Sequence, residues 1–139
     1  MTSKLLLEES LTESIIGAFY DVQCELGFGF REYLYALALQ RELAGRGHRV
    51  DREVAVMVAY RGEPLAKQTL DMIVDGKVVV ENKAGERLHP SATSQLFSYL
   101  CATDMEVGLL LHFGREPRFY RVICENRFKR RGRAHRWKR

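Results

Sequence analysis

The spacing of apolar residues divides the chain into helical and extended segments. Up to residue 44, apolar side chains recur every three or four positions, which is the period of an amphipathic helix. Farther along, they alternate with polar residues or run continuously, as they do in β-strands. The predicted helices span residues 11–26, 30–44 and about 91–103, and the predicted strands span residues 50–60, 66–74, 78–83, 107–113 and 119–124.

The order of these segments predicts an α/β fold with one mixed β-sheet flanked by helices. Three consecutive strands joined by short turns form an antiparallel meander. The helix that follows them makes a crossover, so the fourth strand should run parallel to the third, with a right-handed connection. The unbroken run Val78–Val80 indicates that the third strand lies at the centre, buried on both faces.

Length and composition are those of one globular domain. The chain has 139 residues, of which 46% are hydrophobic and 29% charged, and a core of this size needs no disulfide or metal ion to fold. We expect this domain to span residues 1–126. No signal peptide is visible, and no apolar stretch approaches the roughly 20 residues that cross a membrane. We therefore expect a cytoplasmic protein without membrane contact, and a homodimer stays open.

The three cysteines are an odd number and lie far apart in the sequence. Cys24, Cys101 and Cys124 each occupy an apolar segment without a neighbouring Cys or His. Buried, reduced thiols are therefore the favoured interpretation, over a zinc site or a redox pair.

The net charge of +4 hides an asymmetry along the chain. Residues 127–139 contain eight basic and no acidic residues, whereas the rest contains 14 basic and 18 acidic ones. A block of like charge tends to be flexible and attracts phosphate groups. We therefore predict that Arg130, Arg131 and Arg133 contact nucleic acid. The alternative is a solvated tail that only aids solubility.

Three charged residues in the predicted meander need an explanation. Glu81 and Lys83 close the apolar Val78 strand and share one face of it, and Asp71 lies between apolar residues of the strand before. A salt bridge from Lys83 would satisfy one acid only. A divalent cation held by both carboxylates would account for all three residues, because hard cations prefer oxygen ligands. Spacing alone leaves both explanations open.

The turn between these strands decides whether the two acids meet. A two-residue loop at Asp75-Gly76 would pair position 71 with 80 and place Asp71 and Glu81 on opposite faces. A three-residue loop, Val74–Gly76, would pair position 71 with 79 and place both acids on one face, a diagonal apart. We predict the second arrangement, with a positive φ at Gly76.

Several motifs together resemble a known family. They occur in the order expected of the small bacterial and archaeal GxxExxY proteins, and they cover nearly the whole chain apart from the basic tail. That family is similar to the PD-(D/E)XK nuclease superfamily, whose core is a helix, a three-strand meander, a crossover helix and a strand. The motifs are ELGFG at 25–29, GFREYLY at 29–35, Asp71, VENK at 80–83 and QLFSYL at 95–100.

The resemblance implies a role for each site residue. Asp71 and Glu81 match the metal ligands, with help from the Asn82 carbonyl, and Lys83 matches the catalytic lysine. Glu32 matches the helix acid that supports the metal directly or through water. Asn82 departs from the family pattern, which has an apolar residue there.

The same resemblance adds three residues on the substrate side. Gln95 and Tyr99 match a Q-x-x-x-Y helix motif, and their spacing of four places them on one helix face. Gln95 is expected to position a water or a phosphate oxygen. Tyr99 and Tyr35 are either nucleic-acid contacts or core aromatics with a hydroxyl bonded at the rim.

The implied activity is metal-dependent hydrolysis of phosphodiester bonds in DNA or RNA, with Mg²⁺ or Mn²⁺ as the cofactor. Two alternatives stay open. One is a non-catalytic nucleic-acid-binding or assembly module that keeps the nuclease fold. The other is a structural or partner-binding subunit whose acids and lysine form an ion network.

Overall fold

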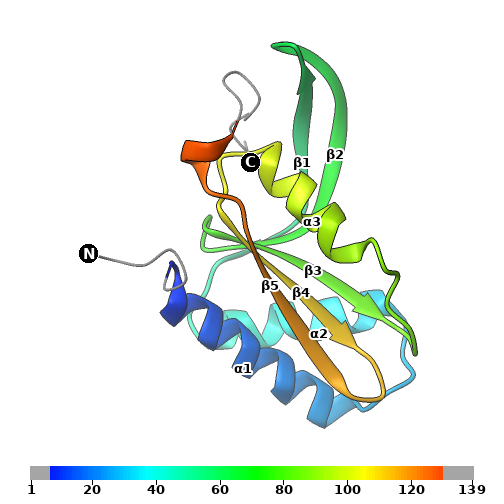
Figure 1. Cartoon of the computed structure of the whole chain (residues 1–139). Helices are drawn as coiled ribbons and strands as arrows, with labels where there is room; N and C mark the ends of the chain where they lie inside the picture. Colours follow the sequence, from blue (N-terminus) through cyan, green and yellow to red (C-terminus); the bar gives the residue numbers. More distant parts are fainter. Residues whose placement is uncertain (1–6, 130–139) are drawn as a thin grey trace.

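A five-stranded mixed sheet forms the centre of the structure (Figure 1). The computed structural model describes residues 7–129. The strands lie side by side in chain order, β1-β2-β3-β4-β5, with β3 and β4 parallel and the other neighbours antiparallel. The strands are β1 (Val50–Tyr60), β2 (Glu63–Val74), β3 (Val78–Ala84), β4 (Val107–Phe113) and β5 (Pro117–Ile123).

Helices cover both faces of this sheet. The helices α1 (Glu9–Leu26) and α2 (Glu32–Gly45) pack on one face, and α3 (Ala92–Cys101) packs on the other (Figure 1). A short 3-10 helix, η2 (Asn126–Phe128), follows β5. The element order and the parallel β3–β4 crossover confirm the predicted α/β architecture.

Strand alternation in β3 divides the core into two layers. Val78 and Val80 pack toward α1 and α2, whereas Val79 packs toward α3, and all three are fully buried. β4 is buried along its whole length. β3 is thus the central strand, as its apolar run predicts.

The β1–β2 hairpin is much longer than its contact with the rest of the sheet. β2 pairs with β3 only over Met72–Val74, so most of the hairpin extends beyond β3 (Figure 1). Its base packs against α3 through Val54, Val56 and Leu70. Only the base of the hairpin, where Val50–Arg52 pair with Met72–Val74, therefore lies beside β3 in the five-stranded sheet.

The hairpin changes faces at Glu53 and Asp71. In a regular strand, residues two apart share a face. Leu70 packs with the α3 layer, however, whereas Met72 packs with the α1–α2 layer. The pairing of β1 with β2 skips Glu53 and Asp71, and Glu53 has a left-handed φ of 52°. The pairs on either side, Arg52–Met72 and Val54–Leu70, keep one register, so no extra residue is inserted and the change of face is local.

The predicted register of β2 and β3 is wrong by two residues. Val74 pairs with Val78, so the loop is Asp75–Lys77 and not Val74–Gly76. Gly76 has the predicted positive φ, at 65°, and Asp75 shares it, at 52°. One step beyond the observed pairs, position 71 would face 81 directly, so the predicted approach of the two acids survives the correction.

Among residues 7–129, no helix is both long and apolar enough to span a membrane.

Candidate active site

The two predicted acids meet where β2 and β3 separate. The regular pairing ends at Met72 and Val80. Beyond this pair, hydrogen bonds that involve side chains replace those between the two backbones. The Asp71 N–H donates to Glu81 Oε1 at 3.2 Å, and Asp71 Oδ2 accepts from the Asn82 N–H at 3.1 Å and from Asn82 Nδ2 at 2.6 Å. The strand ends are thus held together by the same carboxylates that form the candidate site.

Burial and charge work against the ionised form of Glu81. Burial raises its pKa, the hydrogen bond from the Asp71 N–H lowers it, and the charge of Asp71 raises it again. Lys83 lowers the pKa and Glu32 raises it, and the balance brings it to about 7. A cation placed between these carboxylates would relieve the repulsion between them.

Lys83 and Glu32 complete the charged cluster. Lys83 is half-buried in β3, two residues after Glu81. Glu32 begins α2 and interacts electrostatically with Lys83 and Asp71. Partial burial of its carboxyl group raises the pKa of Glu32, although Lys83 and a hydrogen bond from the Ala84 N–H lower it. Elements far apart in the sequence thus converge on one charged cluster.

Arg52 is a cation in the site that the sequence did not predict. Its Nη2 lies 3.7 Å from Asp71 Oδ1 and 3.9 Å from Glu53 Oε1. Its Nε atom is buried without a hydrogen-bond partner among the described residues. These distances describe a loose ion pair, so Arg52 neutralises Asp71 in part without occupying its acceptor atoms tightly.

α3 brings one further residue to the cluster. The Tyr99 hydroxyl accepts a hydrogen bond from Gln68 Nε2 at 3.3 Å. Burial and the negative charge of Glu81 raise the pKa of Tyr99. Gln95 lies one turn earlier on α3 and is exposed to solvent, so its role as a water or phosphate contact stays a prediction.

Of the two roles predicted for Tyr35, the structure supports the core aromatic and not the nucleic-acid contact, because Tyr35 is fully buried. Its ring stacks on Phe113, with 4.4 Å between ring centroids and an interplanar angle of 14°. Its hydroxyl donates to the Gly27 carbonyl and accepts from the Phe30 N–H. Tyr35 therefore fixes the segment between α1 and α2 from which Glu32 follows.

The other predicted contacts, Arg130, Arg131 and Arg133, lie outside the described residues, and their contact with nucleic acid stays a prediction.

The oxygen atoms of the cluster fit a hard divalent cation. Asp71 and Glu81 supply carboxylates, and the buried Asn82 Oδ1 has no hydrogen-bond partner among the described residues. Within residues 7–129, however, no three His, Cys, Asp or Glu side chains are grouped to hold a metal ion. Glu32 interacts electrostatically with Asp71 and Glu81, but the three acids are not grouped as one metal site among the described residues.

Sequence reasoning missed Arg52 and Gln68. In β1, Arg52 occupies an alternate position between Val50 and Val54, which are apolar. A charged residue in that apolar pattern was the sequence signal that could have pointed to Arg52. Gln68 had no comparable signal, because its link to Tyr99 depends on how α3 packs against the hairpin.

Comparison with known proteins places this arrangement in a family. The family model described as the PD-(D/E)XK nuclease superfamily matches residues 9–122. A solved structure titled "Crystal structure of SSO0001" is similar in fold, with a TM-score of 0.51 and 21% sequence identity. The similarity covers 87% of this chain and 61% of that one, so this chain spans less than two thirds of its length. Curated proteins gave no match. Since the family model covers most of the chain, from α1 to β5, the chain belongs to the PD-(D/E)XK nuclease superfamily.

Proposed function

We propose that this protein is a divalent-metal-dependent nuclease that hydrolyses phosphodiester bonds in DNA or RNA. The convergence of the Asp71 and Glu81 carboxylates beside Lys83 is the observation that carries this proposal. Superfamily membership supports it. The finer resemblance, to the GxxExxY proteins, stays a prediction.

Each residue of the cluster has a task in the proposed reaction. Asp71, Glu81 and Asn82 would hold Mg²⁺ or Mn²⁺ through oxygen atoms. Such an ion, when bound, polarises a phosphoryl oxygen and lowers the pKa of a coordinated water. Lys83 would orient the attacking water or stabilise the negative charge that develops on the phosphate.

Three residues around this centre would position its components. Glu32 would support the metal ligands from α2, directly or through water. Gln95 would hold a water or a phosphate oxygen, and Tyr99 would contact the substrate. None of these steps needs a covalent intermediate, so no Ser or Cys nucleophile is required.

Cleavage of labelled single- and double-stranded DNA and RNA by the purified full chain with Mn²⁺ tests the proposal. Lys83→Ala should lower the cleavage rate by about 100-fold or more, because it removes a charge aimed at the transition state. Lys77→Ala, which changes an exposed lysine in the β2–β3 loop, should keep the wild-type rate. Equal cleavage by wild type and Lys83→Ala would indicate a contaminating nuclease and contradict the proposal.

A non-catalytic nucleic-acid-binding or assembly module is the second candidate. It is favoured by Arg52 beside Asp71 and by the lack of a three-acid metal group within residues 7–129. Calorimetric titration with Mn²⁺ separates the two functions. A nuclease requires binding that is lost in Asp71→Asn and Glu81→Gln. A binding module shows salt-dependent affinity for nucleic acid and no cleavage with any divalent ion.

A further inference from the structure

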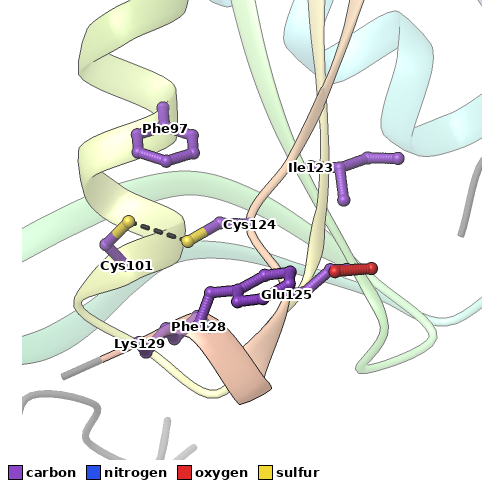
Figure 2. Close-up of a pocket in the computed structure, with 7 residues that line it drawn as sticks. All are labelled: Phe97, Cys101, Ile123, Cys124, Glu125, Phe128 and Lys129. Carbon is purple, nitrogen blue, oxygen red and sulfur yellow. Dashed lines mark hydrogen bonds between the residues drawn. The ribbon is translucent and has the colours of Figure 1, made fainter.

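Two thiols that are distant in the sequence meet at the end of α3. The sequence predicted that no cysteine has a close partner, but Cys101 Sγ and Cys124 Sγ lie 2.8 Å apart. Figure 2 shows the two sulfur atoms facing each other between α3 and the end of β5. Cys24, expected to be buried, is exposed. The chain thus carries one pair of adjacent thiols and one separate thiol.

The thiol pair lines a pocket that opens to the surface. The pocket has a volume of about 430 Å³, and its walls include Phe97, Ile123 and Phe128 (Figure 2). Cys101 and Cys124 are each 7% exposed, so the sulfur atoms are largely shielded without being sealed inside the core. A small molecule can therefore reach them, whereas a bulky macromolecular thiol is hindered.

A cation stands beside the two sulfur atoms. Lys129 Nζ donates to the Thr103 and Met105 carbonyls, each at 2.7 Å, which fixes the amine at the pocket. Burial lowers the pKa of Lys129 overall, whereas the charges of Cys124 and, less strongly, of Cys101 raise it, so the amine and the two thiols interact electrostatically. A nearby positive charge stabilises a thiolate, which is the reactive form of cysteine.

The backbone holds both cysteines in place before any reaction. Cys101 is the last residue of α3, and the Cys124 N–H donates to the Glu106 carbonyl at 2.9 Å. The segment between α3 and β4 is fixed as well, since Thr103 Oγ1 accepts from the Met105 N–H and donates to the Leu100 carbonyl. Little chain ordering is therefore needed to bring the sulfur atoms to the bond length of about 2.05 Å.

We propose that Cys101 and Cys124 form a redox-responsive modification site, in which a peroxide converts the two thiols to a disulfide. The thiolate of Cys124 attacks the O–O bond of hydrogen peroxide, and the leaving hydroxide takes up a proton to become water. The resulting sulfenic acid is attacked by the Cys101 thiol, and its OH group leaves as a second water. The two thiols lose two electrons and two protons, and the peroxide is reduced to two waters.

The disulfide would join the end of α3 to the end of β5. It would close a covalent ring over residues 101–124, which contains β4 and β5. Closing such a loop restricts the unfolded chain and stabilises the folded one. The bond would also restrict the movement of α3, which carries Tyr99 two residues before Cys101. The proposal does not depend on nuclease activity.

Thiol counting and peptide mapping of the full chain test the proposal. The reduced protein should contain three titratable thiols in denaturant, and treatment with a slight excess of hydrogen peroxide should leave one. Mass spectrometry should identify a peptide in which Cys101 and Cys124 are linked, and dithiothreitol should restore three thiols. The Tm of the oxidised form should rise by roughly 5–10 °C.

Two single substitutions serve as matched controls. Cys24→Ser should fall from two thiols to none, because the reactive pair is intact. Cys101→Ser should form no disulfide under the same mild oxidation and should instead accumulate sulfenic acid on Cys124, since the resolving partner is gone. In oxidised wild type, three remaining thiols, or sulfenic or sulfinic acid on either cysteine without the link, would overturn the proposal.

Discussion

Glu81 is the residue at which burial and charge conflict most directly. Its pKa of about 7 means that ionisation of the folded, metal-free protein is disfavoured relative to the unfolded chain, where the ordinary value is 4.5. Protonated Glu81 thus favours folding below about pH 4.5, and this contribution is lost as the pH rises through 7. The full difference amounts to about 3 kcal/mol in the free energy of unfolding.

Glu81→Gln should remove this pH dependence. Gln can still accept the Asp71 N–H, and it carries no charge. With a chelator present, we expect the variant to gain stability over wild type between pH 5 and pH 8, as measured by urea unfolding. Glu86→Gln, which changes an exposed acid in a surface ion pair, should leave the curve unchanged. Parallel curves for wild type and Glu81→Gln would show that Glu81 titrates as an ordinary surface acid.

Arg52 should compete with a divalent cation for Asp71. The guanidinium group and a metal ion would both neutralise the same carboxylate, and Arg52 already lies 3.7 Å from it. Arg52→Met should therefore raise the affinity for Mn²⁺ several-fold, up to about tenfold, in calorimetric titration. Arg52→Lys, which keeps the charge, is the matched control and should stay near the wild-type affinity. Weaker Mn²⁺ binding by Arg52→Met would mean that Arg52 supports the metal site instead.

At the scale of elements, a chain of hydrogen bonds joins α1 to the β2–β3 loop. Ser14 Oγ lies 2.7 Å from His48 Nε2, and His48 Nδ1 lies 2.7 Å from Asp75 Oδ2. Because a carboxylate only accepts, His48 Nδ1 donates to Asp75. The other carboxylate oxygen accepts from the Arg49 N–H at 2.7 Å. The chain thus ties together α1, the entry to β1 and the loop that sets the β2–β3 register.

The pKa of Asp75 makes this link sensitive to acid. Burial alone would raise the pKa, but hydrogen bonds from Arg49 and His48, and the charges of His48 and Lys77, lower it overall. A lowered pKa means that the stabilisation is present above the ordinary value of 3.8 and is lost as the pH falls through the folded value.

Asp75→Asn should cost about 1 kcal/mol in the free energy of unfolding at pH 7, because the bonds to a charged acceptor weaken. Asn tolerates the positive φ at this position, so the substitution tests the charge without adding backbone strain. The difference from wild type should shrink toward pH 2.5 in urea unfolding. Asp21→Asn, in an exposed ion pair with Arg46, should show a smaller effect. A constant difference across this range would contradict the assigned role of the carboxylate.

Hydrophobic periodicity predicted the elements well because burial sets both the pattern and the fold. The continuous Val78–Val80 run identified the central strand, and the crossover helix followed from the order of elements. The predicted register was wrong because turn composition does not fix at which residue the three-residue loop begins. Both Asp75 and Gly76 adopt positive φ, and a non-glycine residue with that conformation was not anticipated.

The candidate site was predictable only where its residues follow a strand pattern or a family motif. Asp71 and Glu81 were found in this way, and their hydrogen bonds across the strand ends bring them together. Arg52 was missed because its inward position in the strand pattern was not followed up, and its approach to Asp71 lies beside the face change at Glu53. For Tyr35 the sequence left a nucleic-acid contact and a core aromatic both open, because a motif shows which residue is present and not whether it is buried.

At the scale of the whole molecule, charge is distributed unevenly between residues 130–139 and the rest of the chain. Residues 130–139 hold six of the 22 Lys and Arg and none of the 18 Asp and Glu, which leaves 16 basic and 18 acidic residues in the rest. The described part is thus slightly acidic overall. Its candidate site adds a partly buried acidic cluster that does not attract a polyanion unaided.

Residues 130–139 should therefore supply much of the affinity for nucleic acid, without taking part in the cleavage reaction. Replacing their six Lys and Arg by Gln keeps the chain length and removes the charge. We expect weaker binding to a labelled oligonucleotide and a shallower slope of log affinity against log salt, by roughly one for each phosphate that the variant no longer neutralises. The cleavage rate at saturating substrate should stay unchanged, because Lys83 and both carboxylates are intact. If the slope is the same for both proteins, the phosphate-binding residues lie on the folded domain and the prediction for Arg130, Arg131 and Arg133 fails.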